Sequence, residues 1–176
     1  MSLRTDAKAR PAYKGIPLAT TTLLALQRLS PADWSHVSYS FNRKEAKSHG
    51  EGGSIVGSPL GGKNVLVLDD VVTAGTAMTE AISIVKAEGG SVIGFVVALD
   101  RMERMPSAAE KEGRDLKEGE EVERGSAMGM VRKEFGVRTT SVVTLDDLVV
   151  LLKESGESED VRRRVEEYRE RYKASD

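Results

Sequence analysis

Cysteine is absent from all 176 residues, and this absence excludes several kinds of chemistry. Without thiols the chain can form neither disulfides nor zinc–thiolate sites, and it has no cysteine nucleophile. Such a composition is compatible with a reducing cytosol, so we expect a cytoplasmic location. Long apolar runs are also absent: none approaches the roughly 18 residues of a membrane span, and we expect no membrane partner.

An excess of charge of one sign is missing as well. The 26 basic and 28 acidic side chains leave a net charge of −2, so nothing global favours nucleic acid as a partner. There is no internal repeat, and the length suits one compact domain with a sizeable core. The composition therefore favours a soluble enzyme or a binding domain.

The most informative stretch is VLVLDDVVTAGTA, residues 65–77. Val65–Leu68 is a short apolar run rich in β-branched residues, which predicts a strand buried on both faces. Asp69 and Asp70 follow where that strand would leave the sheet. The small residues Thr73–Ala77 come next, ahead of a helical pattern, where outward-facing N–H groups and a helix dipole suit a phosphate. The combination predicts a ligand with a phosphate and with hydroxyls or a metal, as in a sugar phosphate.

Two other phosphate-binding motifs do not fit this stretch. It does not match G-x-x-x-x-G-K-[ST], so an ordinary P-loop is not expected, and it lacks the G-x-G-x-x-G of dinucleotide folds. A purely structural interpretation stays open at this point. In it the two acids merely end a strand, and the small residues merely cap a helix.

A second informative stretch, NRKEAKSHGEGGS, spans residues 42–54. Four potential cations fall within seven positions and are followed by glycines; they are Arg43, Lys44, Lys47 and His49. A basic segment hinged by glycines can close over a highly charged anion such as pyrophosphate. The alternative is a solvated, flexible loop with no ligand.

Apolar periodicity predicts an α/β fold with a mainly parallel central sheet flanked by helices. We expect strands at 37–41, 65–68, 91–99 and 137–143, and helices at about 18–30, 78–88, 127–135, 144–154 and 158–173. Ligands of such sheets gather beyond the carboxyl ends of the strands. We therefore expect three pairs of side chains to meet at one edge: Tyr13 with Lys14, Asp69 with Asp70, and Asp100 with Arg101.

The chain divides by composition into a lead-in, a domain and a tail. Residues 1–10 are polar and are expected to be disordered, 11–155 form the α/β domain, and 156–176 form a charged C-terminal helix. Within the domain, 103–124 is rich in charge and predicts a surface excursion. Thr144 followed by Asp147 is close to a capping box, so Asp146 and Asp147 are interpreted as a helix cap and not as a second catalytic pair. The C-terminal helix is expected to pair opposite charges three and four residues apart, such as Glu167 with Arg171.

Four segments together resemble the orotate phosphoribosyltransferases, which are type I phosphoribosyltransferases. They are PAYKGIPLA (11–19), FNRKEAKSHGEGG (41–53), VLVLDDVVTAGTA (65–77) and ALDRMER (98–104), in the order and spacing of that family. The resemblance runs from Pro11 to about Leu152. It implies transfer of the phosphoribosyl group of phosphoribosyl pyrophosphate (PRPP) to orotate with Mg²⁺, in pyrimidine nucleotide synthesis. It also implies a homodimer in which a mobile loop reaches the partner's site.

The resemblance also implies roles for individual residues. The implied PRPP-binding set is Tyr13, Lys14, Arg43, Lys44, Lys47, His49, Asp69, Asp70, Val71, Val72, Thr73, Ala74, Gly75, Thr76 and Ala77. Within it, Lys47, His49, Asp69 and Asp70 are the implied catalytic residues. Thr73 and Arg101 would bind orotate. No residue is assigned as a direct metal ligand, since Mg²⁺ would arrive with PRPP and lie near the two acids.

Family members carry additional residues before the PAYKG segment, including a hood over orotate. Only Met1–Arg10 stands there in this sequence, so the N-terminal hood is expected to be missing or truncated. Either the sequence is part of a longer protein, or the lid over the base is lost and catalytic competence is in question. Two rival functions stay open: a PRPP-binding regulatory or inactive module, and a phosphoribosyltransferase for adenine, hypoxanthine or uracil.

Overall fold

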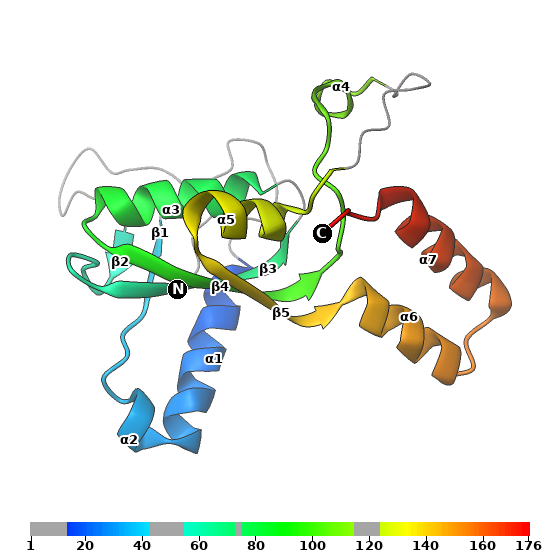
Figure 1. Cartoon of the computed structure of the whole chain (residues 1–176). Coiled ribbons are helices and arrows are strands. Elements are labelled where there is room, and N and C mark those ends of the chain that lie inside the picture. The colour runs from blue at the N-terminus through cyan, green and yellow to red at the C-terminus, as the bar shows by residue number, and fades with distance from the viewer. Residues whose placement is uncertain (1–13, 43–54, 73–74, 115–123) are drawn as a thin grey trace. The chain divides into compact units, whose positions relative to one another are not determined.

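The computed structural model describes residues 14–42, 55–72, 75–114 and 124–176. Within these ranges the helices are α1 (Gly15–Leu29), α2 (Pro31–Trp34), α3 (Thr76–Ala87), α4 (Ala108–Lys111), α5 (Ala127–Phe135), α6 (Leu145–Glu154) and α7 (Glu159–Tyr172) (Figure 1). The strands are β1 (Ser40–Asn42), β2 (Ile55–Gly57), β3 (Asn64–Val72), β4 (Ser91–Asp100) and β5 (Arg138–Thr144). The predicted lead-in 1–10 lies outside the described residues.

The strands form two sheets. A parallel three-stranded sheet has the order β3-β4-β5, and β1 pairs with β2 in an antiparallel ladder that sets Ser40 opposite Gly57. The predicted α/β class with a mainly parallel sheet flanked by helices is confirmed. The strand expected at 37–41 begins only at Ser40, and β2 was not predicted. Three residues are too short to show the alternation of a strand in the sequence.

By internal contacts the described chain separates into two compact units. The first comprises described residues within 1–70 and 76–97, and the second comprises described residues within 71–75 and 98–176. The core of the first is built by apolar residues of β3, α3 and β4, among them Val67, Val85 and Val97, each no more than 2% exposed. Helix α3 buries Met78 and Ala81 as its spacing predicted.

Strand β3 differs from its prediction in two ways. It runs to Val72, so Asp69 and Asp70 lie inside the strand and not after it. Its apolar residues also alternate: Val67 is buried, but Leu66 is 42% exposed, so the expectation of burial on both faces was wrong. Successive side chains of a strand point to opposite faces, and a run of apolar residues does not reveal which face is packed.

The second unit is ordered by capped helices. Ser126 caps α5 by accepting a hydrogen bond from Gly129 N at 2.9 Å. Thr144 and Asp147 form the predicted capping box: Asp147 N donates to Thr144 Oγ1 at 3.1 Å, and Thr144 N donates to Asp147 Oδ2 at 2.8 Å. The interpretation as a helix cap is thereby confirmed for Asp147, while Asp146 lies beside it in the first turn of α6.

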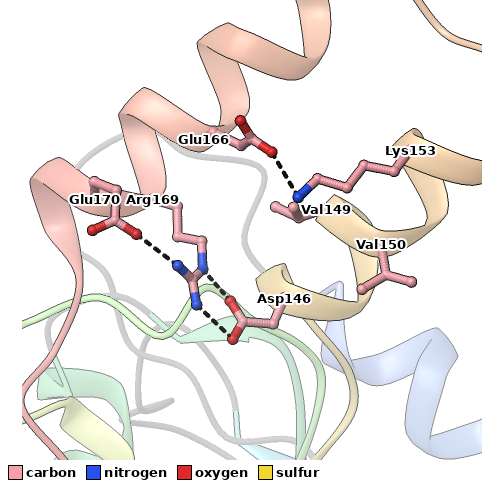
Figure 2. Close-up of a pocket in the computed structure, with 7 residues that line it drawn as sticks. All are labelled: Asp146, Val149, Val150, Lys153, Glu166, Arg169 and Glu170. Atoms are coloured by element: carbon pink, nitrogen blue, oxygen red, sulfur yellow. Dashed lines mark hydrogen bonds and ion pairs between the residues drawn. The ribbon is translucent and has the colours of Figure 1, made fainter.

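Helices α6 and α7 are joined by ion pairs around a pocket of about 420 Å³ (Figure 2). The guanidinium of Arg169 binds both carboxylate oxygens of Asp146, and its hydrogen bond lowers the pKa of that carboxyl. Lys153 Nζ lies 2.9 Å from Glu166 Oε1. The pocket is therefore lined by charges that already have partners within the second unit.

Charge pairs also run along α7, as its sequence predicted. Arg163 pairs with Asp160 at 2.6 Å and with Glu167 at 3.5 Å. The recorded partner of Glu167 is thus Arg163 and not the expected Arg171. Both spacings place charges on one side of a helix, so the pattern alone does not choose between them.

The tail after α7 is tied to the start of the charged segment 103–124. Arg104 N donates to Tyr172 O at 2.8 Å, and Ala174 N donates to Met102 O at 3.0 Å. The carboxylate of Asp176 accepts hydrogen bonds from Ser126 N and Ser126 Oγ. Ser175 N also donates to Arg124 O at 3.1 Å, so the described residues at both ends of the charged segment are held by the tail. None of the helices in the described ranges is long and apolar enough to span a bilayer.

Candidate functional site

The two acids of the central motif lie next to each other inside β3, two residues before its end. Asp69 is buried, with 8% of its surface exposed, and its Oδ1 accepts a hydrogen bond from Asp70 N at 2.9 Å. The Asp70 side chain is 14% exposed. A buried carboxylate needs hydrogen-bond partners, and the backbone of the following residue supplies one here.

Lys14 contacts this acidic pair. Its Nζ lies 3.3 Å from Asp70 Oδ2, and its own side chain is 64% exposed. Lys14 is the N-cap residue of α1, and the hydroxyl of Tyr39 donates to Ile16 O at 3.4 Å within the first turn of that helix. The structure thus brings together the PAYKG segment and the acidic pair, as the sequence predicted for Lys14 and Asp70.

Gly75 has a backbone conformation that favours glycine. Its φ is +74°, and an added Cβ would lie 3.0 Å from Met130 Cε and 3.1 Å from Ala127 Cβ. Helix α3 begins at the next residue, Thr76, so its first N–H groups follow directly on this turn. A left-handed glycine before a helix N-terminus is an arrangement in which backbone amides can face an anion.

The β3 residues Val71 and Val72 precede that turn, and Val72 is buried. Their apolar side chains leave only the backbone to meet a polar ligand. Thr76 is exposed at the start of α3, and Ala77 is half-buried in its first turn.

Arg101 follows β4 and is held by two side chains of the second unit. Its Nη2 donates to the hydroxyl of Tyr168 and lies 2.6 Å from Glu103 Oε1, and its guanidinium lies 5.5 Å from the centre of the Tyr168 ring. About a third of the Arg101 side chain, 34%, stays exposed. A partly exposed guanidinium with a fixed edge suits a planar carboxylate.

Sequence reasoning missed both partners of Arg101. Glu103 stands two residues further on in the ALDRMER segment, so its proximity could have been inferred from spacing. Tyr168 lies in α7, 67 residues away from Arg101, in a helix whose charged pattern gives no sign of a role at a site. Only the tertiary structure reveals that contact.

Several predicted site residues lie outside the described part of the chain: Tyr13, Arg43, Lys44, Lys47, His49, Thr73 and Ala74. Their roles stay predictions from the sequence. Among the described residues, no group of three or more His, Cys, Asp or Glu has the arrangement of a metal site. Two neighbouring carboxylates do fit Mg²⁺ bound mainly through substrate phosphates, because this ion is held by few carboxylates and retains other oxygen ligands.

Comparison with known proteins places the chain in a family. A family profile for the phosphoribosyl transferase domain matches residues 11–114. The orotate phosphoribosyltransferase of Neurospora crassa is 52% identical over 166 residues, which are 94% of this chain and 67% of the fungal protein. That of Serratia proteamaculans is 47% identical over 163 residues, or 92% of this chain and 67% of the bacterial protein.

A solved structure gives the same result. The crystal structure of orotate phosphoribosyltransferase from Francisella tularensis resembles this chain with a TM-score of 0.64 and 28% identity, covering 93% of this chain and 65% of that chain. This chain spans about two thirds of the length of these relatives. From the profile match and the identity to the curated relatives, the chain belongs to the orotate phosphoribosyltransferase family of transferases.

Proposed function

We propose that this chain transfers the 5-phosphoribosyl group of PRPP to orotate, giving orotidine 5′-phosphate and pyrophosphate in de novo pyrimidine (UMP) synthesis. Membership of the family supports the reaction. The observation within the chain that supports it best is the contact of Lys14 with Asp70. The contact places a cation suited to pyrophosphate beside a carboxylate suited to ribose hydroxyls. PRPP carries both a pyrophosphate and ribose hydroxyls.

The acids and the turn at Gly75 would hold the phosphoribosyl part of PRPP. Asp69 and Asp70 would accept hydrogen bonds from the ribose hydroxyls, since ionised carboxylates are acceptors only. Backbone N–H groups within Val71–Ala77 would bind the 5-phosphate, because a turn leading into a helix N-terminus offers several donors together. Lys14, with Tyr13 beside it in the sequence, would face the pyrophosphate.

The reaction is a displacement at the anomeric carbon through an oxocarbenium-like state. Little covalent help is needed, and the main task is to stabilise the departing pyrophosphate and exclude water. Four residues of the basic segment would close over it, some of them across a homodimer with shared sites: Arg43, Lys44, Lys47 and His49. Mg²⁺, when bound with PRPP near Asp69 and Asp70, would neutralise part of the phosphate charge.

Orotate would be recognised by Arg101 and Thr73. A guanidinium presents a planar fork of N–H donors that matches a carboxylate, which the neutral purine bases and uracil lack. This is the chemical reason to favour orotate over the other bases. The absence of cysteine is compatible with the cytoplasm as the place of the reaction.

The decisive experiment incubates the chain with PRPP, Mg²⁺ and one base at a time, and follows the loss of orotate absorbance or the product of each other base. Turnover with orotate alone supports the proposal. Turnover with adenine, hypoxanthine or uracil would identify a different transferase, and PRPP binding without turnover would identify a regulatory or inactive module. Lys47→Ala should lower kcat with little change in PRPP affinity; an unchanged kcat would contradict the role of Lys47 in pyrophosphate departure.

A further inference from the structure

The contacts around Arg101 form a short relay of hydrogen bonds. Arg101 Nη2 donates to the Tyr168 hydroxyl, and that hydroxyl donates in turn to Glu103 Oε1. Glu103 Oε1 also lies 2.6 Å from Arg101 Nη2. Arg101 Nη2 is therefore held both by the hydroxyl of Tyr168 and by the negative charge of Glu103.

We propose that Tyr168 is a positioning residue for orotate, holding the guanidinium of Arg101 so that its remaining N–H donors face the substrate carboxylate. This inference rests on the proposed function, in which Arg101 binds orotate. The recorded polar contacts of Arg101 use Nη2, while 34% of the side chain stays exposed. An arginine side chain loses rotamer entropy when it is fixed, so fixing it in the free protein favours later binding.

The Tyr168 ring adds a second contact to the guanidinium. The Arg101 guanidinium carbon lies 5.5 Å from the ring centre, within the range of a cation–π interaction. The ring is itself packed against Tyr172, with centroids 4.7 Å apart. Burial and the hydrogen bond to Glu103 raise the pKa of the Tyr168 hydroxyl, which therefore stays protonated and able to donate.

The backbone between Arg101 and Glu103 is fixed as well. Met102 has a φ of +53°, in the left-handed region, and its N–H donates to Asp100 Oδ1 at 2.8 Å. Its carbonyl accepts from Ala174 N at 3.0 Å, so the tail after α7 holds this turn. The side chain of Arg101 and the backbone of Met102 are thus both tied to the C-terminal part of the chain.

Tyr168→Phe tests the proposal, because it keeps the ring and removes only the oxygen. The KM for orotate should rise roughly three- to tenfold, as expected for one lost hydrogen bond, while the KM for PRPP and kcat change little. Tyr172→Phe is the matched control in the same helix, because its ring contacts that of Tyr168 but its hydroxyl is outside the relay, and it should leave all three constants unchanged. Equal orotate KM values for the wild-type chain and Tyr168→Phe would overturn the proposal.

A second readout does not depend on turnover. Phenylglyoxal should modify Arg101 faster in Tyr168→Phe than in the wild-type chain or in Tyr172→Phe, as measured by peptide mass spectrometry. If the wild-type chain has no activity with orotate, the proposed function fails. In that case the positioning role of Tyr168 is supported only if orotate still protects Arg101 from phenylglyoxal. Equal modification rates in all three chains would overturn it.

The melting temperature distinguishes a loss of orotate positioning from a general loss of stability in Tyr168→Phe. Where Tyr168→Phe lowers it strongly, Glu103→Gln serves as the second variant, since it removes the charge beside Arg101 and leaves the tyrosine in place. It should likewise raise the orotate KM and spare the PRPP KM. A parallel rise in both KM values would show a general loss of structure and would contradict a positioning role.

Discussion

Lys14 Nζ lies 3.3 Å from Asp70 Oδ2, although 56 residues separate the two in the chain. The contact joins the N-cap of α1 to the carboxyl end of β3, and both partners come from segments that the sequence singled out. With 64% of the Lys14 side chain exposed, the pair contributes little to stability as a surface ion pair. Its significance is the placement of opposite charges at the proposed PRPP site.

Asp70→Asn should weaken PRPP binding. The substitution removes the charge that accepts from ribose hydroxyls, and charged hydrogen bonds contribute about 1.5–3 kcal/mol, so the PRPP KM should rise roughly tenfold or more. Calorimetry with PRPP and Mg²⁺ checks the affinity directly. Asp33→Asn, an exposed change in the short helix α2, should leave it unaltered. An unchanged PRPP affinity in Asp70→Asn would contradict the proposed role.

Gly75→Ala should reduce both stability and PRPP affinity. A left-handed backbone costs a residue with a Cβ about 1–2 kcal/mol, and here the new Cβ would also crowd Met130 and Ala127. Gly62→Ala is the matched control, because Gly62 has a φ of +67° and nothing within 4 Å of an added Cβ. Thermal unfolding should show destabilisation in both variants, larger in Gly75→Ala because of the added crowding, and PRPP titration should show lost affinity only in Gly75→Ala. Equal PRPP affinities would show that this turn does not bind the phosphate.

Asp147→Ala should destabilise the chain without affecting catalysis. The change removes the carboxylate half of the capping box, because the hydrogen bonds that Asp147 Oδ2 accepts from Thr144 N at 2.8 Å and from Thr144 Oγ1 at 2.6 Å would disappear. Denaturant unfolding measures the loss, while kcat and both KM values should equal those of the wild-type chain. A fall in kcat at unchanged substrate affinity would instead support a second catalytic pair of acids.

Glu110 should make the chain sensitive to acid. Hydrogen bonds from Arg124 and from Ser107 N lower the pKa of its carboxyl from 4.5 to about 2. Between pH 4.5 and about 2, the Glu110 carboxyl therefore stays deprotonated in the folded state but takes up a proton in the unfolded chain. The resulting stabilisation is complete above pH 4.5 and is lost as the pH falls toward 2.

The measurement for this group is the melting temperature between pH 5 and pH 2.5. It should fall less steeply in Glu110→Gln than in the wild-type chain, because the amide does not titrate. Glu112→Gln is the control, since Glu112 is exposed and pairs with an equally exposed Arg114. Parallel curves for the wild-type chain and Glu110→Gln would contradict the link between this carboxyl and acid stability.

Local patterns in the sequence predicted much of the fold. Helix α5 has the predicted bounds, and the box of Thr144 and Asp147 was found because both hydrogen bonds lie within four residues. The length of β3 was not predicted, because two acids normally end a strand, and here Asp69 is buried with its neighbour's N–H as a partner. The burial of Asp69 depends on the tertiary structure around the strand, and a sequence window cannot show it.

The candidate site was predictable where a motif groups its own residues. The segment 65–77 and the Lys14–Asp70 contact follow from motifs and from the rule that ligands gather at strand ends. The partners of Arg101 did not follow, because Tyr168 reaches it from α7 across 67 residues of chain. Contacts between distant segments depend on how helices dock, and helix amphipathicity does not specify a single partner.

The most direct test of the proposed PRPP site is a crystal structure of the chain soaked with PRPP and Mg²⁺. The 5-phosphate should lie within hydrogen-bond distance of backbone N–H groups between Gly75 and Ala77, with the ribose hydroxyls donating to Asp69 and Asp70. A phosphate bound elsewhere, or a turn at Gly75 filled by the protein's own side chains, would contradict the proposal.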